Sequence, residues 1–300
     1  MRAAWRIAFF ATATVAGGML VAGVLYPLLS LTPMVSLARE WRLPLDEVGT
    51  VAALLIGTGV TLRVIDGVPH GAWARVGLHR GALGWRALLA GLAAGSLAIL
   101  VPSVLLVATG RLRLEPQSGA EAWGAAAGVA LVMLAPYAMA EELAMRGYLL
   151  TALRDAIRAP GAVAVTSVIF ALLHLFNPGP TILSTAMVAL AGVFLASVRL
   201  ATGSLYAAFA AHLAWNLVQA AVLHAPVSGL SLPAPGYRAV DAGPTWLTGG
   251  AWGPEGGIAA AAGMLVATFL LLRRPRNAPR TDETRGLQAL QMNRGEATHE

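Results

Sequence analysis

The amino-acid sequence predicts an all-α polytopic membrane protein with about eight transmembrane helices and a polar cavity near the membrane midplane. Hydrophobic residues make up 57% of the chain and charged residues 12%, whereas soluble domains carry about 25% charged residues. The apolar residues gather in stretches close to the roughly 20 residues that span a bilayer core. Carboxylate, imidazole and amide side chains interrupt the later stretches, and these polar positions predict the cavity.

The expected spans, in chain order, are residues 5–31, 49–65, 84–109, 122–140, 161–176, 181–200, 203–224 and 256–272. The first stretch is too long for the apolar part of a signal peptide, so it is expected to remain as an anchor. Residues 1–272 are expected to form a single integral-membrane domain, with its motif core at about 122–224. Residues 273–300 are polar and predict a disordered cytoplasmic tail.

Arginine supplies all 21 basic residues, and most of them lie at the ends of the expected spans. Sixteen fall on the side of both termini and five on the other side. Because basic residues collect on the cytoplasmic side, both termini are expected to be cytoplasmic. Topology thus accounts for the net charge of +6, and no nucleic-acid partner is expected. The lack of lysine, with abundant Ala and Gly, indicates a GC-rich genome. We expect the protein in a bacterial cytoplasmic (inner) membrane.

The segments between the spans carry their own signals. Residues 226–255 form a Pro/Gly-rich loop, in which Trp246 and Trp252 are expected at the outer membrane interface. The segment His70–Arg86 is typical of a short interfacial helix on the cytoplasmic side. Pro136 is expected to kink or break the fourth span, and a turn is expected at Pro160. The chain has no cysteine, which excludes disulfides, thiolate metal ligands and a cysteine nucleophile.

Two adjacent glutamates, Glu141 and Glu142, lie in an otherwise apolar run. A carboxylate in hydrocarbon costs roughly 3 kcal/mol on insertion scales, so a chain retains such a pair for chemistry or ion conduction. Glu142 and Arg146 are four residues apart and can form an ion pair on one helix face. Glu141 points about 100° away from Glu142 and can therefore face a cavity.

Helix rise places further polar residues at a similar depth. Measured from the turn at Pro160, Glu141 lies about 28 Å and His174 about 21 Å along their helices. From the same side of the membrane, His212 lies about 15 Å and Asn216 about 21 Å along the seventh span. Three helices can therefore present polar groups to one active-site cavity.

These residue types support the hydrolysis of an amide bond. A carboxylate beside a histidine can orient and deprotonate a water molecule. A histidine and an amide on a facing helix can donate hydrogen bonds to a developing oxyanion. The same groups, Glu141, His174 and His212, could instead bind a divalent metal such as zinc together with a water molecule. The helix motif His-Glu-x-x-His is absent, so such a site would be assembled across helices. The cofactor is therefore either none or a divalent metal.

Three motifs follow one another in separate apolar spans, namely Glu-Glu-x-x-x-Arg, Phe-x-x-x-His and His-x-x-x-Asn. Together they resemble the CAAX-protease and bacteriocin-processing (CPBP) family of intramembrane proteases. The residues that carry the resemblance, and hence the expected catalytic set, are Glu141, Glu142, Arg146, His174, His212 and Asn216, with Phe170 before His174.

The resemblance implies an intramembrane endopeptidase that cleaves a membrane-associated or lipidated peptide or protein. It also implies that Glu141 is the general base and His174 its partner on the water. His212 with Asn216 would then hold the oxyanion. Whether a metal takes part is left open.

Other interpretations use the same residues. Glu142 and Arg146 can form a purely structural ion pair, and His212 with Asn216 can hydrogen-bond helices together. A proton-coupled transporter could use the Glu and His side chains as a relay. A catalytically silent immunity-type membrane protein is a further alternative. A serine protease using Ser167 or Ser204 is disfavoured, because no Gly-x-Ser-x-Gly-like sequence surrounds either residue.

Overall fold

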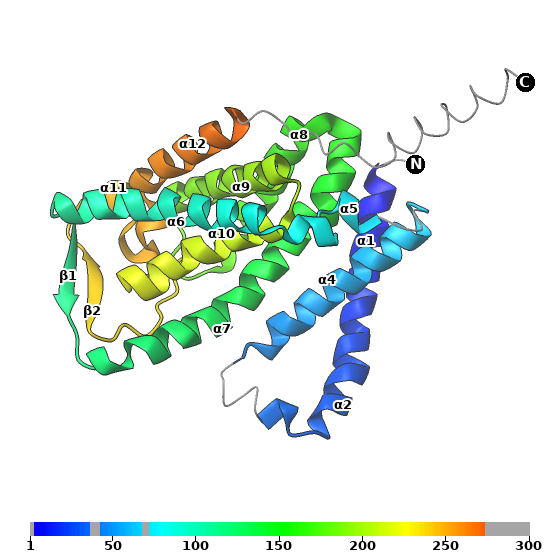
Figure 1. Ribbon diagram of the computed structural model, residues 1–300, viewed down its shortest axis with the longest axis horizontal. Helices are drawn as coiled ribbons and strands as arrows, with labels where there is room; N and C mark the ends of the chain where they lie inside the picture. The colour runs from blue at the N-terminus through cyan, green and yellow to red at the C-terminus, as the bar shows by residue number, and fades with distance from the viewer. Residues whose placement is uncertain (1–2, 37–42, 68–71, 274–300) are drawn as a thin grey trace, which may run out of the picture.

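The computed structural model describes residues 3–36, 43–67 and 72–273 (Figure 1). The expected tail lies outside the described residues except for Arg273, and so do Arg39, Arg42 and His70. Within the described ranges, the regular structure is helical apart from one two-stranded antiparallel sheet.

The α-helices are α1 (Ala3–Leu20), α2 (Tyr26–Ser30), α4 (Leu45–Val64), α5 (Ala72–Arg75), α6 (Trp85–Ala108), α7 (Trp123–Glu142), α8 (Leu150–Leu173), α9 (Ile182–Thr202), α10 (Leu205–Leu217), α11 (Thr245–Thr248) and α12 (Ile258–Arg273). The strands are β1 (Leu112–Pro116) and β2 (Tyr237–Asp241). Segments of π-helix are η1 (Val21–Leu25), η4 (Leu143–Leu149) and η6 (Val218–Leu223). Short 3₁₀ turns are η2 (Arg80–Leu83), η3 (Ala120–Ala122), η5 (His174–Phe176), η7 (Gly250–Trp252) and η8 (Pro254–Gly256).

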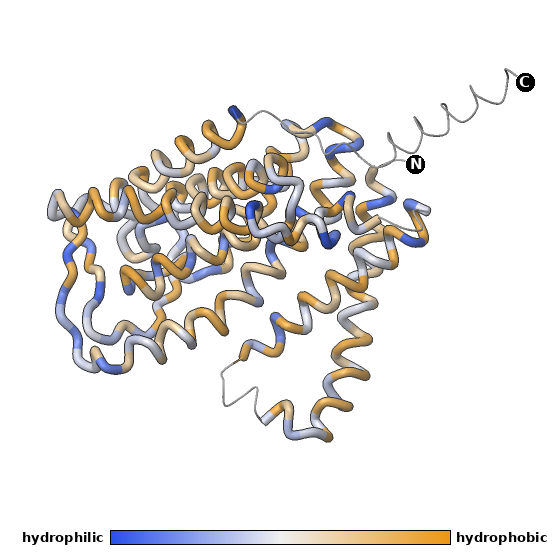
Figure 2. Tube along the Cα trace, in the orientation of Figure 1, coloured by the Kyte–Doolittle hydropathy of each residue, from blue (hydrophilic) through white to orange (hydrophobic). Residues whose placement is uncertain are grey.

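Six helical segments of the described chain are long and apolar enough to cross a membrane. This confirms a polytopic helical membrane protein. One of the six, Ala120–Phe176, has 57 residues and covers both the fourth and the fifth expected spans. Helix α12 is apolar but has 16 residues, so the expected count of eight is approximate. Figure 2 shows hydrophobic residues along most of the helices and hydrophilic residues in the segments around β1 and β2.

Helix α10 lies inside the bundle. The segment Leu205–Leu223 is the most buried of the candidate spans, with 72% of its most apolar stretch buried. Small residues permit this, because a side chain at Gly91 or Gly95 of α6 would collide with the backbone of Ala207 or Ala211 of α10. Small residues at this four-residue spacing let the backbones of two membrane helices approach closely.

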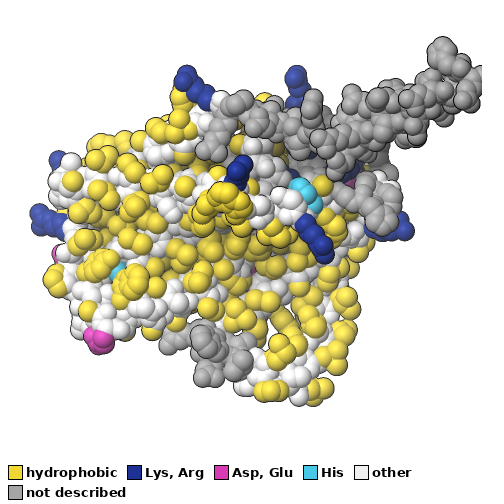
Figure 3. All heavy atoms as spheres, viewed as in Figure 1, with side chains coloured by type: hydrophobic (Ala, Val, Ile, Leu, Met, Phe, Trp, Pro, Cys, Tyr) yellow, Lys and Arg dark blue, Asp and Glu magenta, His cyan; other side chains and the backbone are white. Residues whose placement is uncertain are grey.

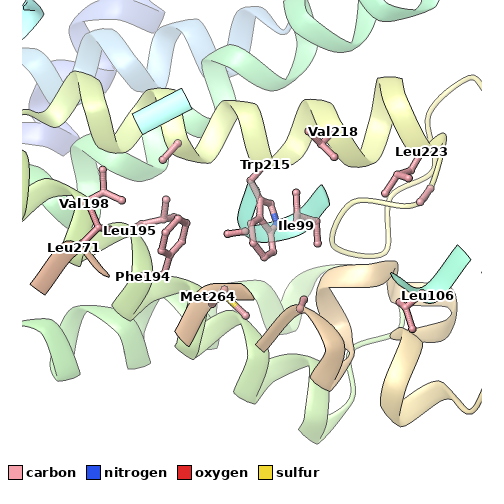
Figure 4. Packing of buried hydrophobic residues seen from close by; sticks show 14 of the residues in the cluster. Ile99, Leu106, Phe194, Leu195, Val198, Trp215, Val218, Leu223, Met264 and Leu271 are labelled. Carbon is pink, nitrogen blue, oxygen red and sulfur yellow. The ribbon is translucent and has the colours of Figure 1, made fainter. Parts of the chain in front are cut away.

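A hydrophobic core fixes α10 against α6, α9 and α12 (Figure 4). Trp215 of α10 lies beside Ile99 of α6, and Phe194 and Met264 belong to the same cluster. The ring centroids of Phe194 and Trp215 are 6.2 Å apart. Because this packing immobilises α10, the polar residues on the same helix hold defined positions.

The helix breaks differ from those expected. Helix α7 continues through Pro136 to its last residue, so this proline does not break it. The irregularity follows the glutamate pair instead: η4 is π-helical, and Gly147 has φ −81° and ψ −116°. The next break falls at Ile157 and at Arg158, whose φ is +62°. It precedes Pro160 because proline fits the first turn of a helix better than its interior.

Helices α1 and α4 pack together as a hairpin, which diverges from α7 at one end (Figure 1). At the other end, charged side chains tie the hairpin to the rest of the bundle. Arg6 of α1 pairs with Asp66 at 3.1 Å and with Asp155 of α8 at 2.8 Å. Arg75 of α5 pairs with the same two aspartates at 3.3 and 2.7 Å. The described part of the segment expected as one interfacial helix thus contains two short turns, α5 and η2.

The loop between α10 and α12 folds back over the bundle. Its strand β2 pairs antiparallel with β1, with Leu112 opposite Asp241. Trp246 is 54% exposed, as expected of an interfacial residue, but Trp252 is buried beside Phe170 and Val188. The expectation for Trp252 was therefore wrong, because the loop carries this tryptophan inward onto the helices.

Figure 3 shows one face covered largely by hydrophobic side chains, with basic side chains standing around it. Two of the sixteen arginines counted on the side of the termini, Arg146 and Arg199, are buried. Each has an internal partner: Arg146 pairs with Glu142, and Arg199 donates to the backbone oxygen of Arg75. The cytoplasmic location of the termini stays a prediction.

Candidate active site

Glu142 and Arg146 form the ion pair that their spacing predicts. The distance from Nη1 of Arg146 to Oε1 of Glu142 is 3.0 Å, and both side chains are almost fully buried. Nη2 of Arg146 donates to the backbone oxygen of Gly192 at 3.2 Å. The guanidinium also lies 4.3 Å from the ring centroid of Phe170, within the range of a cation–π interaction. Arg146 therefore joins η4 to α8 and α9.

His212 lies between the two glutamates. Its Nδ1 is 3.0 Å from Oε1 of Glu142, and its Nε2 is 3.6 Å from Oε2 of Glu141. A carboxylate only accepts hydrogen bonds, so the contact with Glu142 places a proton on Nδ1. The imidazole of His212 therefore contacts both carboxylates.

The ring of Phe170 packs against both histidines of the site. Its ring centroid lies 4.5 Å from that of His174 and 6.1 Å from that of His212. Nδ1 of His174 hydrogen-bonds to the backbone oxygen of Phe170 at 2.8 Å. A carbonyl oxygen only accepts, so Nδ1 carries the proton and Nε2 of a neutral His174 is left as an acceptor. The sequence motif Phe-x-x-x-His therefore fixes one imidazole directly after the end of α8.

A cavity of about 680 Å³ adjoins these residues. It is bounded by α1, α4, α7, α8, α10 and the loop after η6, and its candidate site residues are Glu141, His174, His212 and Asn216. The side chain of Glu141 is 34% exposed, whereas that of Glu142 is fully buried. The adjacent carboxylates therefore face opposite environments: Glu141 meets the cavity, and Glu142 meets Arg146 and His212.

The structure brings the candidate residues together and adds a contact that the sequence did not predict. His212, not His174, is the imidazole within 3.6 Å of Glu141. In the described chain no hydrogen bond joins Glu141 to His174, and the two residues meet only across the cavity that both line. The reason is that Phe170 and the turn η5 direct His174, whereas α10 packs directly against α7.

The side chains do not fit the alternative metal site. Both ring nitrogens of His212 face carboxylates, and Nδ1 of His174 bonds to a backbone oxygen. Within residues 3–36, 43–67 and 72–273, no group of three or more His, Cys, Asp or Glu side chains converges closely enough to hold a metal ion. This geometry differs from the tetrahedral arrangement that zinc requires.

Sequence reasoning missed one buried carboxylate beside the site. Glu255, in η8, lines a small pocket together with His174, His212 and Asn216. It lies in the Pro/Gly-rich loop, and no spacing rule connects it with the distant residues that it contacts. One sequence feature could have indicated a buried role for Glu255, namely that it lies in an apolar, Gly-rich stretch directly before the last span.

A family model matches the part of the chain that forms the candidate site. Residues 121–218, about a third of the chain, match the family model described as type II CAAX prenyl endopeptidase Rce1-like. The match covers all six candidate catalytic residues. It confirms the resemblance to the CPBP family of intramembrane proteases. Comparisons with curated proteins and with solved structures give no match.

Proposed function

We propose that this integral membrane protein, which carries an Rce1-like CAAX endopeptidase domain at residues 121–218, hydrolyses a peptide bond near the membrane through a water molecule activated by Glu141. The observation that carries the proposal is the asymmetry of the glutamate pair. Glu142 is buried and bonded to Arg146 and His212, whereas Glu141 faces a cavity that three polar side chains of η5 and α10 also line.

Glu141 acts as the general base. Its carboxylate accepts a proton from a water in the cavity, and the resulting hydroxide attacks the carbonyl carbon of the scissile bond. Nε2 of His174 has the acceptor character needed to orient the second hydrogen of that water. The proton held by Glu141 then passes to the nitrogen of the leaving amine as the tetrahedral intermediate collapses, so the carboxylate is regenerated.

His212 and Asn216 stabilise the oxyanion. As an imidazolium, His212 donates from Nδ1 to Glu142 and presents its Nε2–H toward Glu141 and the cavity. The amide of Asn216 lies four residues later and lines the same cavity. Donors that are fixed in a site sheltered from water stabilise a developing negative charge without having to reorganise. Arg146 and Glu142 do not contact the reacting atoms in this account; they position His212.

The cavity favours a substrate with an apolar segment. Besides the polar site residues, leucine, methionine and alanine side chains form much of its wall, among them Leu54, Met133, Leu134 and Met145. This wall suits an apolar peptide segment or a lipid chain attached near the cleaved bond. We therefore propose membrane-associated or lipidated peptides as substrates, and no divalent metal as a cofactor.

The direct test is a cleavage assay on the purified protein in detergent. Matched lipidated and unlipidated peptides are incubated with the wild-type protein in water enriched in ¹⁸O. The masses of the products are then measured by mass spectrometry. Cleavage with ¹⁸O in the new carboxyl group supports hydrolysis by an activated water. A transporter or a silent membrane protein would leave every peptide intact, and that result would contradict the proposal.

A further inference from the structure

Glu255 is only 9% exposed, and both of its carboxylate oxygens accept hydrogen bonds. Oε2 accepts hydrogen bonds from Nε1 of Trp215 at 2.6 Å and from Nε2 of Gln219 at 2.9 Å. Oε1 accepts from both the backbone N–H and the hydroxyl of Ser228, each at 2.6 Å. Four donors satisfy a buried carboxylate well, and such charge-assisted bonds are stronger than neutral ones.

The two donors to Oε2 belong to the helix that carries half of the proposed site. Trp215 directly precedes Asn216 and follows His212 by three residues, and Gln219 follows Asn216 by three. Helical spacing places these side chains next to the catalytic face of α10. Glu255 therefore holds the part of α10 and η6 on which the oxyanion donors stand.

The two donors to Oε1 lead to the other half of the site. The backbone oxygen of Ser228 accepts from Nδ2 of Asn177 at 3.1 Å. The backbone N–H of Asn177 in turn donates to the oxygen of His174 at 3.1 Å. We call Asn177, Ser228 and Glu255 the loop strap. It forms a continuous hydrogen-bonded path from the backbone of His174 to Trp215, beside Asn216.

Two further observations show that the loop strap holds a specific conformation. Ser228 has φ +48°, a left-handed conformation that a residue with a side chain adopts rarely. The backbone N–H and the hydroxyl of Ser228 both donate to Glu255, so the carboxylate stabilises this unfavourable backbone conformation. The small pocket lined by His174, His212, Asn216, Ser228 and Glu255 has a volume of about 30 Å³. These five residues therefore lie close together around Glu255, and four of them also line the larger cavity.

We infer that Glu255 is a positioning residue, which acts through the loop strap to set the separation between His174 and the His212–Asn216 pair. The inference rests on the proposed function, in which these three side chains surround one water and one carbonyl group. A displacement of about 1 Å of a catalytic group can cost about 10²-fold in rate. A strap that fixes this separation is expected to affect the chemical step more than substrate binding.

The test compares Glu255→Gln, Asn177→Ala and the double variant with a control in the same loop. Glu255→Gln keeps the shape of the side chain but replaces one accepting oxygen by an NH₂ group, which cannot accept hydrogen bonds from the donors that face it. The control is Thr248→Val, because Thr248 is buried in the same loop and donates to Pro244, away from the strap. We expect each strap variant to lower kcat by about 10–100-fold with KM little changed. The kcat of the double variant is expected to be no lower than that of either single variant, because Glu255 and Asn177 act through the same loop strap. Thr248→Val is expected to keep the wild-type kcat.

A readout independent of catalysis separates failure of this inference from failure of the proposed function. The chain has no cysteine of its own, so spin labels can be attached at Leu175→Cys and Val222→Cys, two exposed positions on either side of the strap. The distance distribution should be narrow in the parent and broader in both Glu255→Gln and Asn177→Ala. If the wild-type protein cleaves no peptide, the proposed function fails. The distance distribution between the spin labels then tests by itself whether the loop strap holds the two parts of the site together. If Glu255→Gln does not fold, Asn177→Ala supplies both readouts.

The inference is overturned if the strap variants keep the wild-type kcat, if their effects on kcat multiply as those of independent sites, or if the control loses as much activity as they do. An unchanged distance distribution in both strap variants would also overturn it.

Discussion

His212 and Glu142 are joined by a buried contact of 3.0 Å between Nδ1 and Oε1, and this same oxygen accepts the bond from Arg146. One carboxylate oxygen therefore fixes both a cation on its own helix and an imidazole on α10. Glu142 does not line the cavity, yet its bond to Nδ1 sets the orientation of the His212 ring. The other ring nitrogen of His212 consequently faces Glu141. Glu142 thus connects the ion pair of the first motif to the histidine of the third.

Removal of Arg146 should destabilise the protein as well as lower its activity. In Arg146→Ala, Glu142 would remain as a buried carboxylate with one cationic partner lost, and breaking a buried pair costs about 3–5 kcal/mol. The measurement is thermal unfolding in detergent, recorded beside the cleavage rate. The double variant Glu142→Gln/Arg146→Met should recover much of the lost thermal stability, because it removes both charges. Equal melting temperatures for the single and the double variant would show that the two side chains are not coupled.

His212→Ala should retain a small part of the activity. If His212 only stabilises the oxyanion and orients Glu141, its loss should lower kcat by about 10²–10³-fold, with the amide of Asn216 still in place. Metal analysis of the purified wild-type protein is run in parallel. Stoichiometric zinc that is lost in both His174→Ala and His212→Ala would instead identify the histidines as ligands. Activity that resists strong chelators would support the metal-free account.

Gly95 should tolerate no side chain. A methyl group at this position would collide with the backbone carbonyl of Ala211, whereas the space around Gly128 of α7 is open. We expect Gly95→Ala to destabilise the bundle by about 1–3 kcal/mol, as overpacking does, and Gly128→Ala to melt like the wild type. Because α10 carries His212, the first substitution should also reduce cleavage. A fully stable and active Gly95→Ala variant would contradict the close approach of α6 and α10.

The residues of the site were predictable from the sequence because insertion into a membrane makes each polar group conspicuous. Glu141, Glu142, His174, His212 and Asn216 interrupt stretches that are otherwise apolar, and helix rise places them at a common depth. The pairing between Glu142 and Arg146 follows from their spacing on one helix. Contacts between helices do not follow from spacing. The sequence therefore did not predict that α10 brings His212 within 3.6 Å of Glu141.

The parts of the fold that were not predictable depend on long-range packing. The break after the glutamates occurs at Gly147, a residue type with wide conformational freedom, and not at Pro136. Trp252 and Glu255 lie in a loop whose composition indicates only turns and an interface. Their burial arises because the loop folds back over the helices, and no local pattern encodes that return.

The central claim is that Glu141 is the general base, and the cleavage rate of Glu141→Gln tests it most directly. The matched control is Glu47→Gln, because Glu47 also lines the cavity and the change removes the same charge there. The account predicts that Glu141→Gln folds like the wild type and loses about 10²–10⁴-fold in kcat, the usual contribution of general base catalysis, while Glu47→Gln keeps most of the activity. Wild-type kcat in a folded Glu141→Gln variant would contradict the account, as would an equal loss in both variants.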